Sequence, residues 1–373
     1  MSDDEYVDDF IAAGLYDPEA PDAEAMLELL EYLVDELDAS IPEIVKAVEE
    51  DQLLSFAGFR HVRPDGARLT LNEMAAAADV DAAFAQRVWR AAGFPAPRPF
   101  ERRFDAADVR ILELMKIGID LVGEDGVIQL MRTLGAATQQ IAESEVALVR
   151  SQMEAPLLSG QRYVDVARSY RDAVVGLLPQ VINVIDALHR HHIENIVRRY
   201  AGAGPPSPVN VVSLAVGFAD LSGYTGLSAQ LDASQLSLML TRFEEVTGDV
   251  VASAGASIAK RIGDAVMFVT NAPGIACALA IELVEACARE RLPKLRAGVA
   301  FGDVIVRHGD FYGSVVNMAA RLVAAAEPGT VLADPALHER LHRVRGPYTF
   351  MPAGRITLAG FGDPVETFQL LRP

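Results

Sequence analysis

The sequence predicts an α+β protein, in which an all-α N-terminal domain precedes a C-terminal ferredoxin-like domain of βαββαβ order. Three observations predict this class. The run AGAGPPSP at 201–208 cannot continue a helix, because it combines glycine with proline. Before this run apolar residues recur every three to four positions, as in amphipathic helices, whereas after it short β-rich runs end at glycine turns. We therefore expect a helical domain at 1–200, a linker at 201–208 and a sheet domain at 209–373.

Helical periodicity covers most of the first 200 residues. The stretch 22–37 places its leucines, methionine and valine on one face of a helix. Asp105, with Asp108 three residues later, forms a loose capping box at the start of another helix. Further helical stretches are expected at 104–121, 126–153 and 163–200.

A helix, a turn and a second helix are expected at 69–94, in the sequence LTLNEMAAAADVDAAFAQRVWRAAGF. With RRFDAADVRIL after it, this stretch is similar to the helix-turn-helix half of MerR-type regulators. Its second helix carries only Arg87 and Arg90, which are few for contacts to phosphates and bases. A structural helical module and a DNA-binding element both stay open as interpretations.

The pattern of residues in the second half of the sequence predicts the strands and helices of the sheet domain. Gly263-Asp264 is expected to join the second and third strands, and Gly302-Asp303 is expected to turn within the fourth. A terminal hairpin is expected at 355–371, turning at 360–364. The expected strands are 209–218, 257–262, 265–270 and 295–306, and the expected helices are 232–254, 275–291 and 314–326.

Charge and cysteine content exclude several classes of protein. The net charge is −19, and the first 60 residues hold 18 Asp/Glu against 2 Lys/Arg, so the acidity belongs to one segment. This segment is either a solvated face or a surface that docks on basic residues of its own chain or of a dimer partner, and it disfavours nucleic-acid binding. Two cysteines and no basic leader indicate a reducing, cytoplasmic setting. The apolar stretch 174–188 is too short and too interrupted for a membrane span.

Carboxylates stand at two predicted strand ends, in FADLSGYT and KRIGD. Asp220 follows the first strand, and Asp264 lies between the second and third strands. These strands are neighbours in a ferredoxin-like sheet, so the two carboxylates can converge and hold divalent cations for phosphoryl chemistry. Further along, GDFYGSVVNMAAR places Asn317 and Arg321 on one helical face, where an amide and a guanidinium suit a sugar and a phosphate.

Taken together and in this order, the three motifs at 209–373 resemble the class III nucleotidyl cyclases. The resemblance implies that Asp220 and Asp264 hold two divalent cations, Mg²⁺ or Mn²⁺. It also implies that Asn317 positions the ribose of the substrate and that Arg321 stabilises the pentavalent phosphate. The combination of motifs is specific, whereas each motif alone is common.

By the same resemblance, Lys260 and Asp310 recognise adenine. A lysine can donate to adenine N1 and an aspartate can accept from the N6 amino group, whereas guanine presents the opposite pattern. The implied reaction converts ATP to 3′,5′-cyclic AMP and pyrophosphate. Arg296 is considered for a further phosphate contact and stays outside the predicted site.

The resemblance also implies a homodimer with two composite active sites. The metal-binding aspartates, Lys260 and Asp310 are expected from one subunit, and Asn317 and Arg321 from the other. One alternative is a catalytically silent module that binds a nucleotide, against which the complete set of six site residues argues. The other is a DNA-binding regulator that uses 69–94, against which the acidic segment argues.

The resemblance gives the helical domain an autoinhibitory role, as in soluble bacterial cyclases that are released in acid. His189, His191 and His192 lie just before the linker. Histidine changes charge between about pH 5 and 8, so the cluster is either a pH switch or a solvated basic helix end. Zinc binding is not expected, because adjacent histidines cannot share a helical face.

Overall fold

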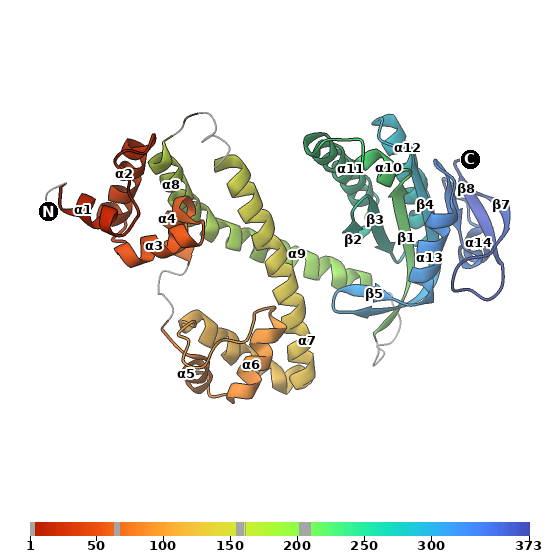
Figure 1. The fold of residues 1–373 in the computed structure, drawn as a ribbon. Coiled ribbons are helices and arrows are strands. Elements are labelled where there is room, and N and C mark those ends of the chain that lie inside the picture. The colour runs from red at the N-terminus through yellow and green to blue at the C-terminus, as the bar shows by residue number, and fades with distance from the viewer. Residues whose placement is uncertain (1–3, 63–67, 154–159, 161, 201–209) are drawn as a thin grey trace. The chain divides into compact units, whose positions relative to one another are not determined.

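The computed structural model describes residues 4–62, 68–153, 160, 162–200 and 210–373. Two compact units divide the chain, Met1–His192 and Ile193–Pro373, and each is described by itself. Figure 1 shows a helical first unit and a second unit built on a sheet, which confirms the predicted α+β class. The expected linker at 201–208 lies outside the described residues.

The second unit is built on a mixed sheet. Its strands, over the described residues, are β1 (Val211–Leu221), β2 (Ser257–Ile262), β3 (Ala265–Thr270), β4 (Leu295–Arg307), β5 (Asp310–Tyr312), β6 (Val331–Ala333), β7 (Thr349–Ile356) and β8 (Val365–Leu371). They lie in the order β2-β3-β1-β4-β6-β8-β7, with β5 paired to β4. The neighbours β2, β3, β1 and β4 have the arrangement of a ferredoxin-like fold, as the βαββαβ order predicts.

Helices cover both faces of this sheet. They are α10 (Tyr224–Ser228), α11 (Ala233–Ser253), α12 (Pro273–Arg289), α13 (Ser314–Ala325) and α14 (Pro335–Leu341). Ala219 and Leu221 of β1 are buried with α11 and α12, whereas Val216 and Phe218 are buried with α13. Because successive side chains of a strand point to opposite faces, Asp220 lies on the α13 face of the sheet.

The prediction of a turn at Gly302-Asp303 is wrong. Strand β4 continues through this dipeptide, because both residues pair with β1. The Ser213 hydroxyl of β1 donates to Asp303 Oδ1 at 2.6 Å, across 90 positions of sequence. The chain turns instead at His308 and Gly309, which both have positive φ, and then forms β5.

The last part of the sheet domain differs from expectation in two ways. The terminal hairpin has a longer first strand, since β7 begins at Thr349 rather than at 355. Strand β6 and helix α14 occupy a stretch that is too short for periodicity to reveal. Asp334 begins α14 as its N-cap, because its Oδ1 accepts from the backbone N–H of Leu337 at 3.0 Å.

The first unit is helical throughout its described residues, apart from loops and one isolated bridge. It contains α1 (Asp4–Ala12), α2 (Ala23–Glu31), the π-helical turn η1 (Tyr32–Glu36), α3 (Ile41–Glu49), α4 (Leu53–Val62), α5 (Leu71–Ala77), α6 (Ala82–Ala91), α7 (Ala106–Met153), α8 (Tyr163–Asp172), the π-helical turn η3 (Ala173–Leu177) and most of α9 (Leu178–Tyr200). The stripe expected at 22–37 is the core here, because Leu29, Leu30 and Leu33 are fully buried. It ends in η1 rather than continuing as an α-helix.

The two stretches expected at 104–121 and 126–153 form α7, which is broken at Gly123 by a non-helical φ of 73°. The capping box at its start is present. Asp105 Oδ1 accepts from the backbone N–H of Asp108, and Asp108 Oδ2 accepts from that of Asp105.

The helix-turn-helix expected at 69–94 is present as α5 and α6. Phe84 and Val88 of α6 are buried against Phe104 in one cluster. Arg87, one of the two arginines on α6, is ion-paired with Glu124 of α7. The geometry therefore agrees with a structural helical module.

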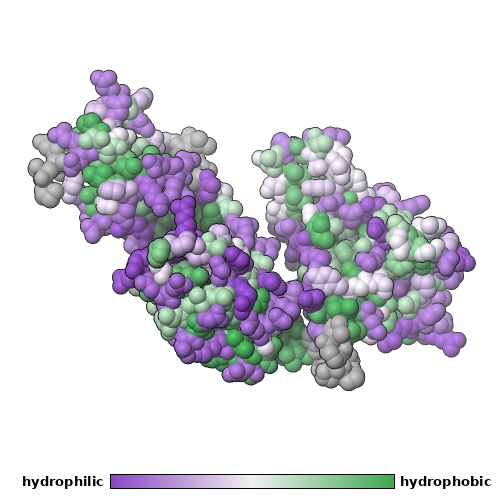
Figure 2. Space-filling model, turned by 60° about the horizontal axis from the view of Figure 1, so that its bottom comes forward, coloured by the Kyte–Doolittle hydropathy of each residue, from purple (hydrophilic) through white to green (hydrophobic). Residues whose placement is uncertain are grey.

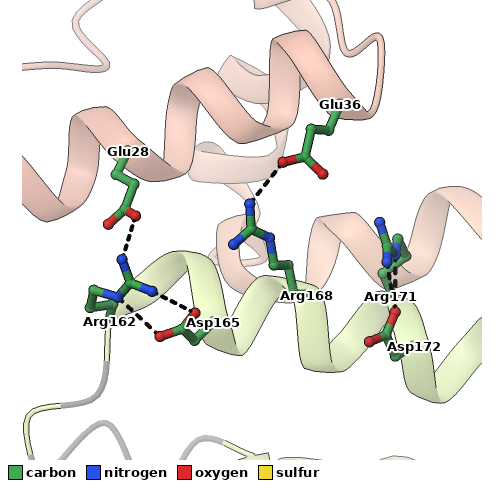
Figure 3. A network of polar contacts seen from close by, with 7 residues as sticks. All are labelled: Glu28, Glu36, Arg162, Asp165, Arg168, Arg171 and Asp172. Carbon is green, nitrogen blue, oxygen red and sulfur yellow. Dashed lines mark hydrogen bonds and ion pairs between the residues drawn. The ribbon is translucent and has the colours of Figure 1, made fainter.

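Two arginines, one at the N-cap of α8 and one within this helix, contact the acidic N-terminal segment (Figure 3). Arg162 lies 2.7 Å from Glu28 and also contacts Asp165, and Arg168 lies 2.7 Å from Glu36. Each pair is exposed, so water screens it and its contribution to stability is small. Part of the acidic segment therefore docks on basic residues of its own chain.

One helical stretch, Tyr163–Arg198, is long and apolar enough to cross a membrane by length and composition only, although the sequence predicts no span. Its best 18-residue window has a mean hydropathy of 1.2, and 6% of that window is buried. Asp172, Asp186 and Arg190 lie within the stretch and disfavour insertion into lipid.

Hydrophobic side chains lie among hydrophilic ones on the surface of both units (Figure 2).

Candidate active site

Asp220 and Asp264 come together at one end of the sheet. Asp220 lies next to the end of β1, and Asp264 lies in the turn between β2 and β3. The backbone N–H of Leu221 donates to the Asp264 carbonyl at 3.2 Å, which ties this turn to β1. Burial, and then the neighbouring Asp220 carboxylate, raise the pKa of Asp264 above its ordinary value.

Two neighbouring carboxylates, one with a raised pKa, fit a divalent cation, because the ion would offset their mutual repulsion. Over the described part of the chain, no group of three or more His, Cys, Asp or Glu gathers into a metal site. A cation held by this pair would take its remaining oxygen ligands from backbone carbonyls, from water or from bound phosphates.

Arg296 lies directly opposite Asp220 in the β1–β4 ladder. Its Nη2 and Nε donate to Asp220 Oδ2 at 2.7 and 3.1 Å, and its Nη1 donates to the carbonyl of Ala324 at 3.2 Å. The guanidinium thus orients the carboxylate and anchors it to α13. The site predicted from the sequence does not include Arg296. The signal that could have indicated a role for Arg296 is a basic residue between Leu295 and Ala297 in an otherwise apolar strand.

Lys260 and Asp310 also come together. Lys260 Nζ donates to both carboxylate oxygens of Asp310, at 2.7 and 2.8 Å, although Lys260 lies on β2 and Asp310 on β5. Burial alone would raise the pKa of Asp310. Hydrogen bonds from Lys260 and from the backbone N–H of Phe311 outweigh burial and hold this pKa below its ordinary value.

Asn317 and Arg321 lie on α13, and both are exposed. They share one helical face, as their spacing predicts. Among the described residues, no hydrogen bond joins either of them to the carboxylates or to Lys260. One chain therefore brings four of the six predicted residues together in two pairs and leaves these two facing solvent.

His189, His191 and His192 lie on α9, and all three are exposed. The nearby Asp186 contacts Arg190 at 2.9 Å, and this hydrogen bond lowers the pKa of Asp186, with a smaller contribution from His189. In one chain the three imidazoles are therefore solvated.

Two known domain families match this chain. Residues 208–372 match the adenylate and guanylate cyclase catalytic domain. Residues 4–196, more than half of the chain, match the adenylate cyclase regulatory domain. The chain belongs to the class III adenylate cyclases. The enzyme class and the helical regulatory domain predicted from the sequence are therefore confirmed.

Several relatives align with most of this cyclase. An uncharacterized protein of Mycobacterium tuberculosis strain H37Rv is 35% identical over 344 residues, which cover 92% of this chain and 89% of the relative. A protein named adenylate cyclase from Glutamicibacter nicotianae is 33% identical over 326 residues, covering 80% and 77%. A protein named pH-sensitive adenylate cyclase from M. tuberculosis strain CDC 1551 is 29% identical over 360 residues, covering 92% and 87%.

Proposed function

We propose that this cyclase converts ATP to 3′,5′-cyclic AMP and pyrophosphate, at composite sites of a homodimer that use two divalent cations. The observation that carries the proposal is the convergence of two pairs in one chain, Asp220 with Asp264 and Lys260 with Asp310. The first pair suits cations and the second suits the edge of adenine.

The chain's own residues account for positioning and charge stabilisation. Asp220 and Asp264 would hold Mg²⁺ or Mn²⁺, which when bound lower the pKa of the ribose 3′-hydroxyl and neutralise phosphate charge. Asn317 orients the ribose, and Arg321 donates to the oxygens of the α-phosphate as negative charge develops there. The 3′-oxygen bonds to the α-phosphorus, the bond from that phosphorus to the pyrophosphate oxygen breaks with its electron pair on pyrophosphate, and the hydroxyl proton passes to water.

The Lys260–Asp310 pair supports ATP as the substrate. Lys260 presents a donor to adenine N1, and Asp310 presents an acceptor to the N6 amino group. The O6 and N1–H of guanine would face a like group at both places, which leaves buried polar atoms unpaired. The hydrogen bonds between the two side chains hold both of them in place before the adenine base binds.

The exposed positions of Asn317 and Arg321 support the homodimer. A site that lies within one chain would need these side chains close to Asp220, and no hydrogen bond among the described residues links them. We propose that α13 of a second chain completes each site, so that a dimer has two equivalent sites.

We also propose that the helical domain inhibits the catalytic domain and responds to pH. The match to a regulatory domain and the relative named pH-sensitive adenylate cyclase support this proposal. His189, His191 and His192 remain the proposed sensors, because histidine is the residue type that most often senses pH near neutrality and all three lie on α9. A cytoplasmic location is proposed because Cys277 and Cys287 are free and buried.

The test is an assay of the full chain with Mn²⁺ and either ATP or GTP, which measures the cyclic nucleotide formed. We expect cyclic AMP from ATP and at least about tenfold less cyclic GMP. Binding of ATP without turnover would contradict the proposal and leave a nucleotide-binding module as the function.

A further inference from the structure

An aromatic side chain projects from the loop between α6 and α7. Phe100 is 91% exposed, more than any other large hydrophobic side chain in the described part of the chain. Its backbone has a φ of 68°, in the left-handed region that bulky residues rarely adopt. Folding therefore buries little of this phenyl ring, although the backbone that carries it is strained.

Hydrogen bonds hold Phe100 in this exposed position. The backbone N–H of Glu101 donates to the carbonyl of Arg98 at 3.1 Å, and Glu101 Oε2 accepts from the backbone N–H of Arg98 at 2.8 Å. These two bonds close a four-residue turn with Pro99 and Phe100 at its centre. Proline occupies every second position of 95–99, which restricts the backbone of the loop further.

The base of the loop is fixed to the core of the first unit. The ring of Phe94 stacks on Trp89, with centroids 4.3 Å apart, and Trp89 Nε1 donates to the carbonyl of Pro95 at 3.1 Å. The other contact of Trp89 is edge-on to the buried ring of Phe104, at 4.8 Å between centroids. The loop therefore keeps its shape before any partner binds.

Positive charge gathers on the same segment. Residues 87–103 contain five arginines and one glutamate. Three of the arginines pair with glutamates of the first unit, namely Arg87, Arg102 and Arg103. Arg90 and Arg98 are exposed, and no ion pair engages either of them over the residues that the structure describes. Two guanidinium groups near an exposed aromatic ring in sequence are therefore available to an anionic partner.

We propose that this loop binds an anionic lipid surface, with Phe100 between the headgroups and the acyl chains and with Arg90 and Arg98 on lipid phosphates. An aromatic ring is favourable at that depth, and a guanidinium forms paired hydrogen bonds with phosphate. A lipid surface admits a projecting ring without a matching groove, which a protein partner would have to supply. Duplex DNA would face the same ring with a polar backbone.

The net charge of −19 opposes approach to an anionic surface. At physiological ionic strength, charges more than about 10 Å from the surface are largely screened, so the arginines of the loop dominate the local interaction. One ring and two arginines give a modest attraction, since each basic residue near such a surface contributes little. The contact is therefore reversible.

The test is flotation of the full chain with vesicles of phosphatidylcholine, either pure or with about 40% phosphatidylglycerol, at physiological salt. Asparagine tolerates a positive φ, so Phe100→Asn removes the ring without adding backbone strain. We expect this variant to bind the anionic vesicles at least about fivefold more weakly than the wild type. Arg98→Gln should weaken binding by about fivefold, and Phe100→Trp should retain it, because tryptophan also favours the interface.

Phe59→Asn and Arg291→Gln are the matched controls. Phe59 is 46% exposed on α4, and Arg291 is exposed in the second unit, so both variants make the same chemical changes away from the loop. Both should float as the wild type does. Absence of the wild type from the vesicle fraction would overturn the proposal, as would equal flotation of folded Phe100→Asn and wild type or equal losses in the controls. Retention on duplex DNA without flotation would assign the loop to nucleic acid instead.

Discussion

Lys260 Nζ lies 2.7 and 2.8 Å from the two carboxylate oxygens of Asp310, fifty positions later in the chain. Neither residue is fully buried, and the pair presents a donor and an acceptor side by side. The ion pair orders both side chains in the free enzyme, which reduces the entropy that substrate binding must overcome. The predictions below begin from this pair.

Reversal of the donor and acceptor should change the base that the enzyme prefers. Lys260→Glu with Asp310→Cys should shift the ratio of ATP to GTP turnover toward GTP by at least about tenfold, because the edge then matches guanine. Total activity should fall, since the surrounding contacts remain those of the wild type. Steady-state kinetics with both nucleotides check this. An active double variant with unchanged ATP selectivity would place base recognition elsewhere.

Asp264→Asn should separate metal-dependent activity from stability. Its carboxylate has a pKa raised by burial and by Asp220, so ionisation of this group lowers the stability of the folded chain relative to the unfolded chain. Removal of this charge should leave the thermal midpoint in EDTA unchanged or higher, while activity with Mn²⁺ falls at least about 100-fold. Thermal scans and cyclic AMP assays measure the two effects. A clear loss of stability without metal would mean that Asp264 is chiefly structural.

Composite sites should be revealed by mixing inactive chains. Neither Asp220→Ala nor Arg321→Ala should turn over alone, but mixed chains should recover about a quarter of wild-type activity. Half of the dimers are then mixed, and one of their two sites holds both lesions. The measurement is cyclic AMP formation after subunit exchange. Exchange verified by a tag on one variant, without recovery, would argue that each site lies within one chain.

Asp334 should make the stability of the second unit depend on pH. This carboxylate is 6% exposed, and burial raises its pKa to about 6, although it accepts from the backbone N–H groups of Leu337 and Phe301. A folded-state pKa above the unfolded value means that stability falls as pH rises from about 4 to 6, by roughly 3 kcal/mol.

Asp334→Asn removes this titration and loses one hydrogen bond, because an amide nitrogen cannot accept from the Phe301 N–H. The thermal midpoint of the variant minus that of the wild type should therefore increase from pH 4 to pH 7. A constant difference over this range would show that Asp334 keeps an ordinary pKa in the folded protein.

Activity of the full chain should be higher at pH 6 than at pH 8, and replacement of His189, His191 and His192 by Gln should reduce this difference. The three imidazoles are exposed in one chain, and charge alone permits either direction, so the expected direction comes from the resemblance to cyclases that are released in acid. The pH profiles of both full-length proteins measure the effect. A triple variant with the wild-type profile would show that other groups sense pH.

Local sequence patterns determined the domain organisation and the positions of several site residues. The helical and sheet domains followed from periodicity and from a Gly/Pro run, because helices and strands bury one face at fixed spacing. FADLSGYT and KRIGD placed Asp220 and Asp264 at strand ends, and the order of strands was enough to bring those ends together. Asn317 and Arg321 share a helical face because four residues make about one turn.

Tertiary structure decided what depends on partners far along the chain. Gly302-Asp303 looks like a turn, but pairing with β1 some 90 positions away holds it in a strand. The tie of Arg296 to Asp220 and the docking of Glu28 on Arg162 likewise join residues 76 and 134 positions apart. Such contacts arise only when strands and helices pack, because packing brings together side chains whose separation in sequence carries no periodic signal.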